Sequence, residues 1–162
     1  MDTYKAKKIG SRQAIKAVTI GLIIAQSIMS LPSIADNGFL KGFFWFLDES
    51  FRYNILIAII CMYLCGHLFG QRAGYEILIR NRNNFIIGIL CGLLIIVTTT
   101  FLAGLVGFFQ EGLDDIGSND NPFIDYIIKP VFLVSIFGFT PCLFVGLWFG
   151  YSIKKRGDLT KT

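Results

Sequence analysis

Four continuous apolar stretches constrain this chain more than any other feature of its sequence. Each is close to the roughly 20 residues that a helix needs to cross a bilayer, and none carries a charge near its centre. Backbone polar groups in lipid must be bonded within their own segment, and the stretches lack the alternation of a membrane β-barrel. The sequence therefore predicts an all-α integral membrane protein with spans at 17–34, 53–70, 85–109 and 126–151.

Composition supports the same fold class. Hydrophobic residues make up 54% of the 162 residues and charged residues 16%, whereas a soluble domain has about 25% charged residues. One soluble core cannot hold this much apolar surface, so the remainder faces lipid. We expect one transmembrane domain over 17–151, with basic cytoplasmic tails at 1–16 and 152–162.

The basic residues are distributed unequally between the two sides of the predicted membrane domain. Twelve of the fifteen lysines and arginines lie in the N-terminal tail, the loop between the second and third spans, and the C-terminal tail. Eight of the eleven acidic residues lie in the two other loops. Because cytoplasmic loops are enriched in Lys and Arg, both termini are predicted to be cytoplasmic. The basic residues mark topology and do not indicate nucleic-acid binding.

The first span has an alternative interpretation. A basic start, an apolar stretch and Ser33-Ile34-Ala35 also fit a cleaved secretory signal. Cleavage would leave three spans in the same orientation. The sixteen-residue start is long for a signal, so four spans are expected. No Asn-x-Ser/Thr sequence occurs, which agrees with a location in a bacterial inner membrane.

One pentapeptide pattern, Gly-x-x-Phe-Gly, ends both the second and the fourth spans, as GHLFG and GLWFG. Glycines four apart share a helix face and let helices approach closely in lipid. We expect two antiparallel helical hairpins, with these glycines packing against a neighbouring helix or a partner. Internal duplication is the alternative. The glycines concerned are Gly66, Gly70, Gly146 and Gly150, with a further pair in the third span, Gly88 and Gly92.

The first outer loop carries an aromatic cluster made of Phe39, Phe43, Phe44, Trp45 and Phe46. Aromatic rings favour the interface between lipid and water, and the segment is too short to span. It predicts a short helix lying in the outer interface. That helix either anchors the loop or forms a docking surface for another membrane protein.

A few polar side chains fall within the spans. Gln26 needs a hydrogen-bonding partner in lipid, so it should face another helix of the chain or of a partner. Thr98, Thr99, Thr100 and Thr140 are candidates for a polar seam between helices. His67 is the only histidine and a weak functional candidate, since histidine titrates near neutral pH.

The sequence contains no recognisable constellation for catalysis. A single histidine and scattered cysteines do not form a metal site, and the acidic second outer loop lacks the ligand spacing of a calcium loop. Phosphate-binding and dinucleotide-binding patterns do not occur. We therefore expect no catalytic residues, no metal and no cofactor.

Three functions remain. The first is a non-catalytic protein that binds another membrane protein, either as an accessory subunit or as an immunity protein. In its length, four spans, cytoplasmic termini and basic tail the chain is similar in outline to immunity proteins against pore-forming bacteriocins. The similarity includes no shared motif, so it assigns no role to any residue. The second is an oligomeric transporter or channel for a neutral solute or lipid. The third is a lipid-modifying enzyme that uses His67, Arg72, Glu76 and Arg80.

Overall fold

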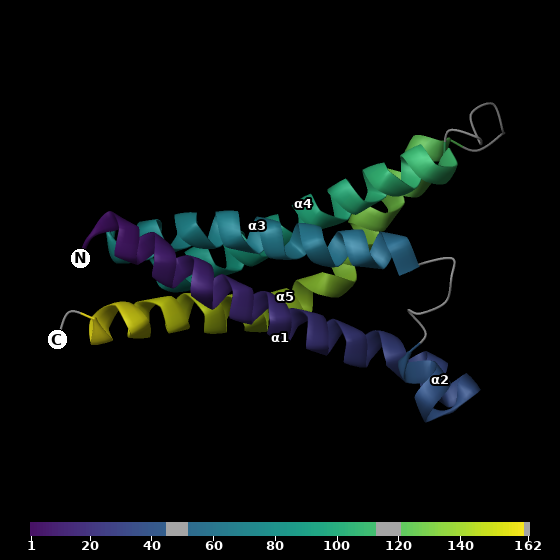
Figure 1. The fold of residues 1–162 in the computed structure, drawn as a ribbon, viewed down its shortest axis with the longest axis horizontal. Helices are drawn as coiled ribbons and strands as arrows, with labels where there is room; N and C mark the ends of the chain where they lie inside the picture. The colour runs from purple at the N-terminus through teal and green to yellow at the C-terminus, as the bar shows by residue number, and fades with distance from the viewer. Residues whose placement is uncertain (45–51, 113–120, 161–162) are drawn as a thin grey trace.

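The computed structural model describes residues 1–44, 52–112 and 121–160, and all regular secondary structure in these ranges is helical (Figure 1). Short π-helical turns lie before and after residues 113–120. The helices are α1 (Thr3–Asn37), α2 (Phe39–Phe43), α3 (Arg52–Leu78), α4 (Asn84–Gly107), η2 (Phe108–Gly112), η3 (Ile124–Ile128) and α5 (Lys129–Leu159). The prediction of an all-α fold is confirmed.

Three helical segments in the described residues are long and apolar enough to cross a membrane: Asn54–Leu78, Asn84–Gln110 and Ile124–Leu159. Within the most apolar window of each, no more than 22% of the residues are buried. Helices with so little buried surface place their apolar side chains outward, as lipid-facing helices do. The expected first span, 17–34, lies inside α1, where the side chains of Met29, Pro32 and Ser33 fall outside the described residues.

The helices continue beyond the predicted spans at the end of the molecule that holds both termini. α3 extends eight residues past Gly70, and α5 extends eight residues past Tyr151. α1 begins at Thr3, so most of the segment expected as an N-terminal tail is helical and packs against α3. Small residues drive this difference, because Ala6 and Gly10 fit closely against Gly74.

α1 packs against α3 through small residues on both helices. A Cβ added to Gly10 would lie 2.7 Å from the Cα of Gly74, and one added to Gly70 would lie 3.0 Å from the carbonyl oxygen of Gly10. Distances of this kind leave no room for a side chain, so the two backbones touch. The glycine row on α3 continues from Gly66 and Gly70 to Gly74, one turn beyond the repeated pattern.

α4 packs against α5 in the same way. A Cβ added to Gly146 would lie 3.0 Å from the carbonyl oxygen of Gly88, and one on Gly150 would clash with the backbone of Asn84. Gly92 lies against the Sγ of Cys142. The repeated Gly-x-x-Phe-Gly pattern thus closes one helix pair in each half of the chain.

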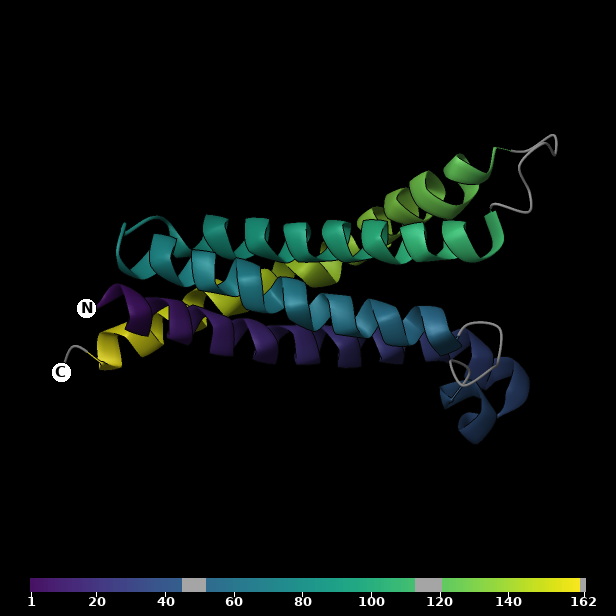
Figure 2. The same ribbon diagram turned by 45° about the horizontal axis from the view of Figure 1, so that its top comes forward.

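The two helix pairs meet at one end and separate at the other. Figures 1 and 2 show α1 with α2 diverging from the ends of α4 and α5 that lie farthest from the termini. The shared apolar core lies at the end with the termini, where Phe149 and Ile153 of α5 are buried with Ala14 of α1 and Ile77 of α3. We call this the closed half, and we call the diverging end the open half.

Glycine substitutions test the backbone contacts. Gly88→Ala should destabilise the α4–α5 pair, because its Cβ would meet the backbone of Gly146 and Gly150. Overpacking of this kind costs about 1–3 kcal/mol. The measurement is the free energy of unfolding in detergent, with unfolding monitored by circular dichroism.

Gly21→Ala is the matched control, because a Cβ at Gly21 has nothing within 4 Å. Equal unfolding free energies for the two variants would contradict the contact between α4 and α5.

Candidate functional site

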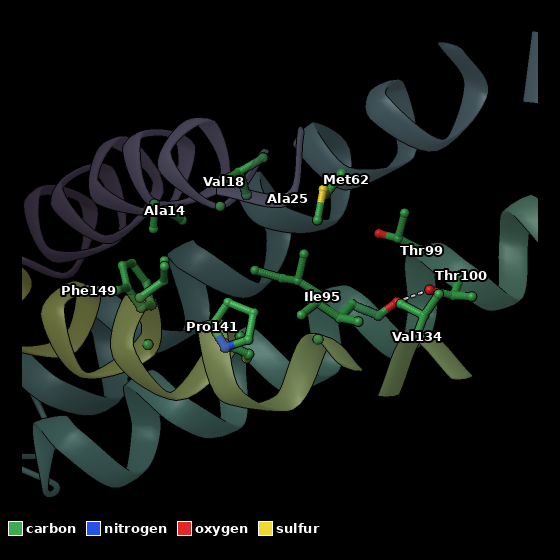
Figure 3. A pocket seen from close by; sticks show the side chains of 18 residues that line it. Ala14, Val18, Ala25, Met62, Ile95, Thr99, Thr100, Val134, Pro141 and Phe149 are labelled. Carbon is green, nitrogen blue, oxygen red and sulfur yellow. Dashed lines mark hydrogen bonds between the residues drawn. The ribbon is translucent and has the colours of Figure 1, made fainter. Parts of the chain in front are cut away.

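An apolar cavity of about 190 Å³ lies between the two helix pairs, where the closed half gives way to the open half (Figure 3). All four long helices contribute to its lining. α1 presents small residues toward it, including Ala17 and Gly21, and α5 presents Gly138 and Pro141. Because these side chains are small, the two pairs can meet without filling the space between them.

Thr99 supplies a buried polar atom to the cavity lining. Thr99 is 5% exposed, and its Oγ1 has no hydrogen-bond partner within the described residues. In Figure 3 the hydroxyl oxygen of Thr99 points in among the labelled lining residues. Thr100 also lines the cavity, but its Oγ1 donates to the carbonyl oxygen of Ile96 at 2.9 Å.

The structure separates the other members of the predicted polar seam. Thr98 is half-buried on α4, and Thr140 is exposed on α5. Across the described ranges, no hydrogen bond joins Thr140 to the α4 threonines. Consecutive residues of one helix point in different directions, which is why Thr98 does not join Thr99 and Thr100 in the cavity lining.

Gln26 faces a helix of its own chain. Its Nε2 donates to the carbonyl oxygen of Phe43 at 2.7 Å and to the Oγ of Ser30 at 3.1 Å. The chain reverses at Gly38, whose φ of 78° favours glycine, and α2 then folds back along α1. Gln26 therefore bonds one of the last carbonyls of α2, which the helix itself leaves without an N–H donor.

The aromatic cluster at residues 39–46 lies partly on α2. Phe39 stacks on Phe43 with ring centroids 6.1 Å apart, and Phe43 meets Phe44 edge-on at 5.2 Å. Phe39 and Phe44 are exposed. Trp45 and Phe46 lie outside the described residues. A short helix is present where one was predicted.

His67 lies on α3 with both ring nitrogens hydrogen-bonded. Its Nδ1 lies 2.7 Å from the Oγ of Ser11, and its Nε2 lies 2.7 Å from the Nε2 of Gln71. Because the amide nitrogen of Gln71 can only donate, Nε2 of His67 accepts, which leaves Nδ1 to donate to the Oγ of Ser11. Through Ser11, the histidine ties α3 to α1.

Glu76 is buried on α3 and neutralised by two arginines. Its carboxylate oxygens lie 3.1 Å from Nη1 of Arg80 and 3.2 Å from Nε of Arg82. The pairing stabilises the tight connection between α3 and α4, where Asn83 caps α4 by accepting from the N–H of Phe85. His67 and Glu76 are nine residues apart, about 14 Å along a helix, so they do not form one reaction centre.

The four cysteines are free, and three of them, Cys65, Cys91 and Cys142, are buried. In the described ranges, no group of three or more His, Cys, Asp or Glu side chains is placed to hold a metal ion.

Comparison of the chain with protein-family models, with curated proteins and with solved structures gives no match. The function of this chain is therefore inferred from its own geometry.

Sequence reasoning missed two features of the site. The pattern Ala6, Gly10 and Ala14 on α1 has the same four-residue spacing as the glycines of α3, and that spacing was available in the sequence. No comparable sequence pattern indicates the cavity, because Gly21 and Gly138 come to line one space only when the two helix pairs meet.

Gln26→Leu tests how α2 is held. Loss of the bond to the Phe43 carbonyl should speed amide hydrogen exchange in residues 39–44, with little change in the closed half. Hydrogen exchange followed by mass spectrometry measures both regions. Ser27→Ala is the control, since Ser27 bonds the carbonyl of Ile23 in its own helix; faster exchange at α2 in that variant would contradict the role of Gln26.

Proposed function

We propose that this chain is a non-catalytic four-span protein of a bacterial inner membrane that works by binding another membrane protein. The observation that supports the proposal is the uneven packing of the bundle. Backbone contacts between glycines close each helix pair, and the core that the pairs share in the described residues lies toward the end with the termini. Among the described residues of the open half, each pair leaves large apolar side chains without a counterpart in the other pair.

The open half exposes large side chains on both helix pairs. Ile28 of α1 is 51% exposed, Leu56 of α3 is 55% exposed and Phe137 of α5 is 77% exposed. Helices in lipid associate by close packing and by hydrogen bonds. A helix of another membrane protein can pack against both helix pairs at once. It then fixes the position of one pair relative to the other, whereas mobile acyl chains do not.

The glycine faces are not the surfaces that receive this partner. Gly66, Gly70, Gly88, Gly92, Gly146 and Gly150 all lie against another helix of the same chain. Gln26 is likewise bonded to α2. The proposed partner surface therefore consists of exposed aliphatic and aromatic side chains of the open half, together with Phe39 of α2 and Phe44, which follows α2.

The orientation belongs to the same proposal. The start of α1, the turn between α3 and α4, and the end of α5 lie at one end of the molecule (Figure 1). The described segments at that end hold eleven of the fifteen basic residues. Under the positive-inside rule this end faces the cytoplasm. The two helix pairs then act as two hairpins that enter and leave from that side, with α1 as the first span.

Reporter fusions test the topology. A green fluorescent protein fused after Thr162 should fluoresce in a bacterial host, because it folds in the cytoplasm, and a C-terminal alkaline phosphatase should stay inactive. A fusion in the loop after α2 should give the reverse result. A fluorescent fusion at both positions would contradict four spans with cytoplasmic termini.

Site-specific photocrosslinking tests the partner. A photoreactive amino acid at Ile28 or Phe137 should give one discrete heavier adduct in membranes of the native host. The same amino acid at Leu68 or Phe144 is the matched control, because these positions are 64% and 70% exposed but lie nearer the closed half.

The mass of the adduct distinguishes the candidate functions. A stoichiometric second protein, found only from the open half, supports the accessory or immunity function. An adduct of twice the chain mass supports the oligomeric transporter. Protein adducts that form equally from all four positions, or lipid adducts alone, would contradict the proposed partner surface.

A further inference from the structure

The cavity between the helix pairs is a built space with one unused polar atom. Its lining includes Ala17, Gly21, Met62, Ile95, Gly138 and Cys142, contributed by four helices. None of the lining residues is charged. Its volume of about 190 Å³ exceeds that of an engineered apolar cavity of about 150 Å³ that binds benzene. The space is therefore large enough for a small organic molecule or for part of a longer chain.

A second, independent observation that points to a ligand is the unpartnered hydroxyl of Thr99. A threonine in a helix can bond the carbonyl four residues earlier, and Thr100 does so with Ile96. Thr99 lies next to it, is 95% buried, and leaves its Oγ1 without a partner among the described residues. A buried polar group of this kind requires an explanation, and an absent ligand is one.

Water fits this cavity poorly. A buried water needs two to four polar partners, and the cavity offers the Thr99 hydroxyl beside a lining that is almost wholly apolar. An ionic ligand fits no better, since no lining side chain carries a compensating charge. The chemistry that remains is an apolar molecule with a single hydroxyl or carbonyl oxygen.

The depth of Thr99 along α4 further restricts the class of ligand that can bind. Thr99 lies fifteen residues from Asn84, which begins α4, so it lies about 22 Å along the helix. The hydrocarbon core of a bilayer is about 30 Å thick. The other end of α4, Gly107, lies eight residues beyond Thr99, about 12 Å along the helix. With α4 as a membrane span, the hydroxyl is therefore remote from both ends of the span, and from the ester carbonyls and headgroups of phospholipids. A ligand must bring its own polar atom to that depth.

We propose that the cavity binds a membrane-soluble apolar molecule that bears one hydroxyl or carbonyl group, held by a hydrogen bond to Thr99. The apolar part of the ligand packs against the small residues of α1 and α5. Its polar atom bonds the Oγ1 of Thr99 in place of the missing partner. This proposal does not depend on the membrane-protein partner proposed above.

A photoactivatable alcohol tests the proposal directly. The full chain is reconstituted in lipid nanodiscs and labelled with a medium-chain alcohol that carries a diazirine, and with the matching alkane that lacks the hydroxyl. Adducts are mapped by mass spectrometry. The alcohol should label lining residues such as Met62 and Cys142 in a saturable manner, above the level of the exposed helix faces.

Thr99→Val removes the hydroxyl and keeps the shape of the side chain. It should lower saturable labelling by the alcohol about two- to tenfold, which is the range expected for one hydrogen bond, and leave labelling by the alkane unchanged. Thr140→Val is the matched control, because Thr140 is exposed and does not line the cavity. It should leave labelling by both probes unchanged.

Gly21→Leu provides a second test, and we expect the fold to tolerate this substitution. A Cβ at Gly21 meets nothing within 4 Å and Gly21 lines the cavity, so we expect the leucine side chain to enter the cavity without displacing a helix. It should abolish saturable labelling by both probes while the unfolding temperature is kept or raised. Equal alcohol labelling of wild type and Thr99→Val, or saturable labelling that survives Gly21→Leu, would overturn the proposal.

Discussion

The contact of helix backbones at glycine is the interaction on which the rest of this structure depends. In lipid, apolar side chains gain little by moving from one apolar environment to another, so helices associate through van der Waals packing and hydrogen bonds. Packing is strongest where backbones approach most closely. Gly10 against Gly70 and Gly74, and Gly88 against Gly146 and Gly150, provide that approach once in each helix pair.

The same small residues explain why the molecule is closed at one end and open at the other. They concentrate in the half that holds the termini, where Phe149 and Ile153 complete a shared core. Farther along, large side chains such as Phe137 point outward, and the pairs diverge. Where the pairs separate, Gly21 and Gly138 face a space that no side chain fills. The cavity is thus a consequence of the packing that stabilises each pair.

Polar groups in this protein are mostly bonded near their own position in the chain. Gln26 bonds the end of α2, Glu76 pairs with Arg80 and Arg82, and His67 joins Ser11 to Gln71. These bonds hold α2 against α1, stabilise the turn between α3 and α4, and link α1 to α3. Thr99 differs from them, since its hydroxyl is buried beside the cavity and has no hydrogen-bond partner among the described residues, whereas the buried Oε2 of Glu76 at least forms an ion pair with Arg82. That difference is why the cavity, and not the histidine or the glutamate, carries the chemical proposal.

The sequence by itself determined the helical fold and the membrane-type helices, because continuous apolar stretches leave the backbone no other way to satisfy its hydrogen bonds. The four-residue spacing of Gly66 and Gly70, repeated at Gly146 and Gly150, also marked the packing faces of two helices. Only the tertiary structure decided which helix each face meets, that Gln26 turns to α2, and that Thr99 rather than Thr98 or Thr140 lies beside a cavity. The physical reason is that periodicity assigns a residue to a face of its own helix, whereas a cavity depends on the distance and angle between helices that are far apart in the chain.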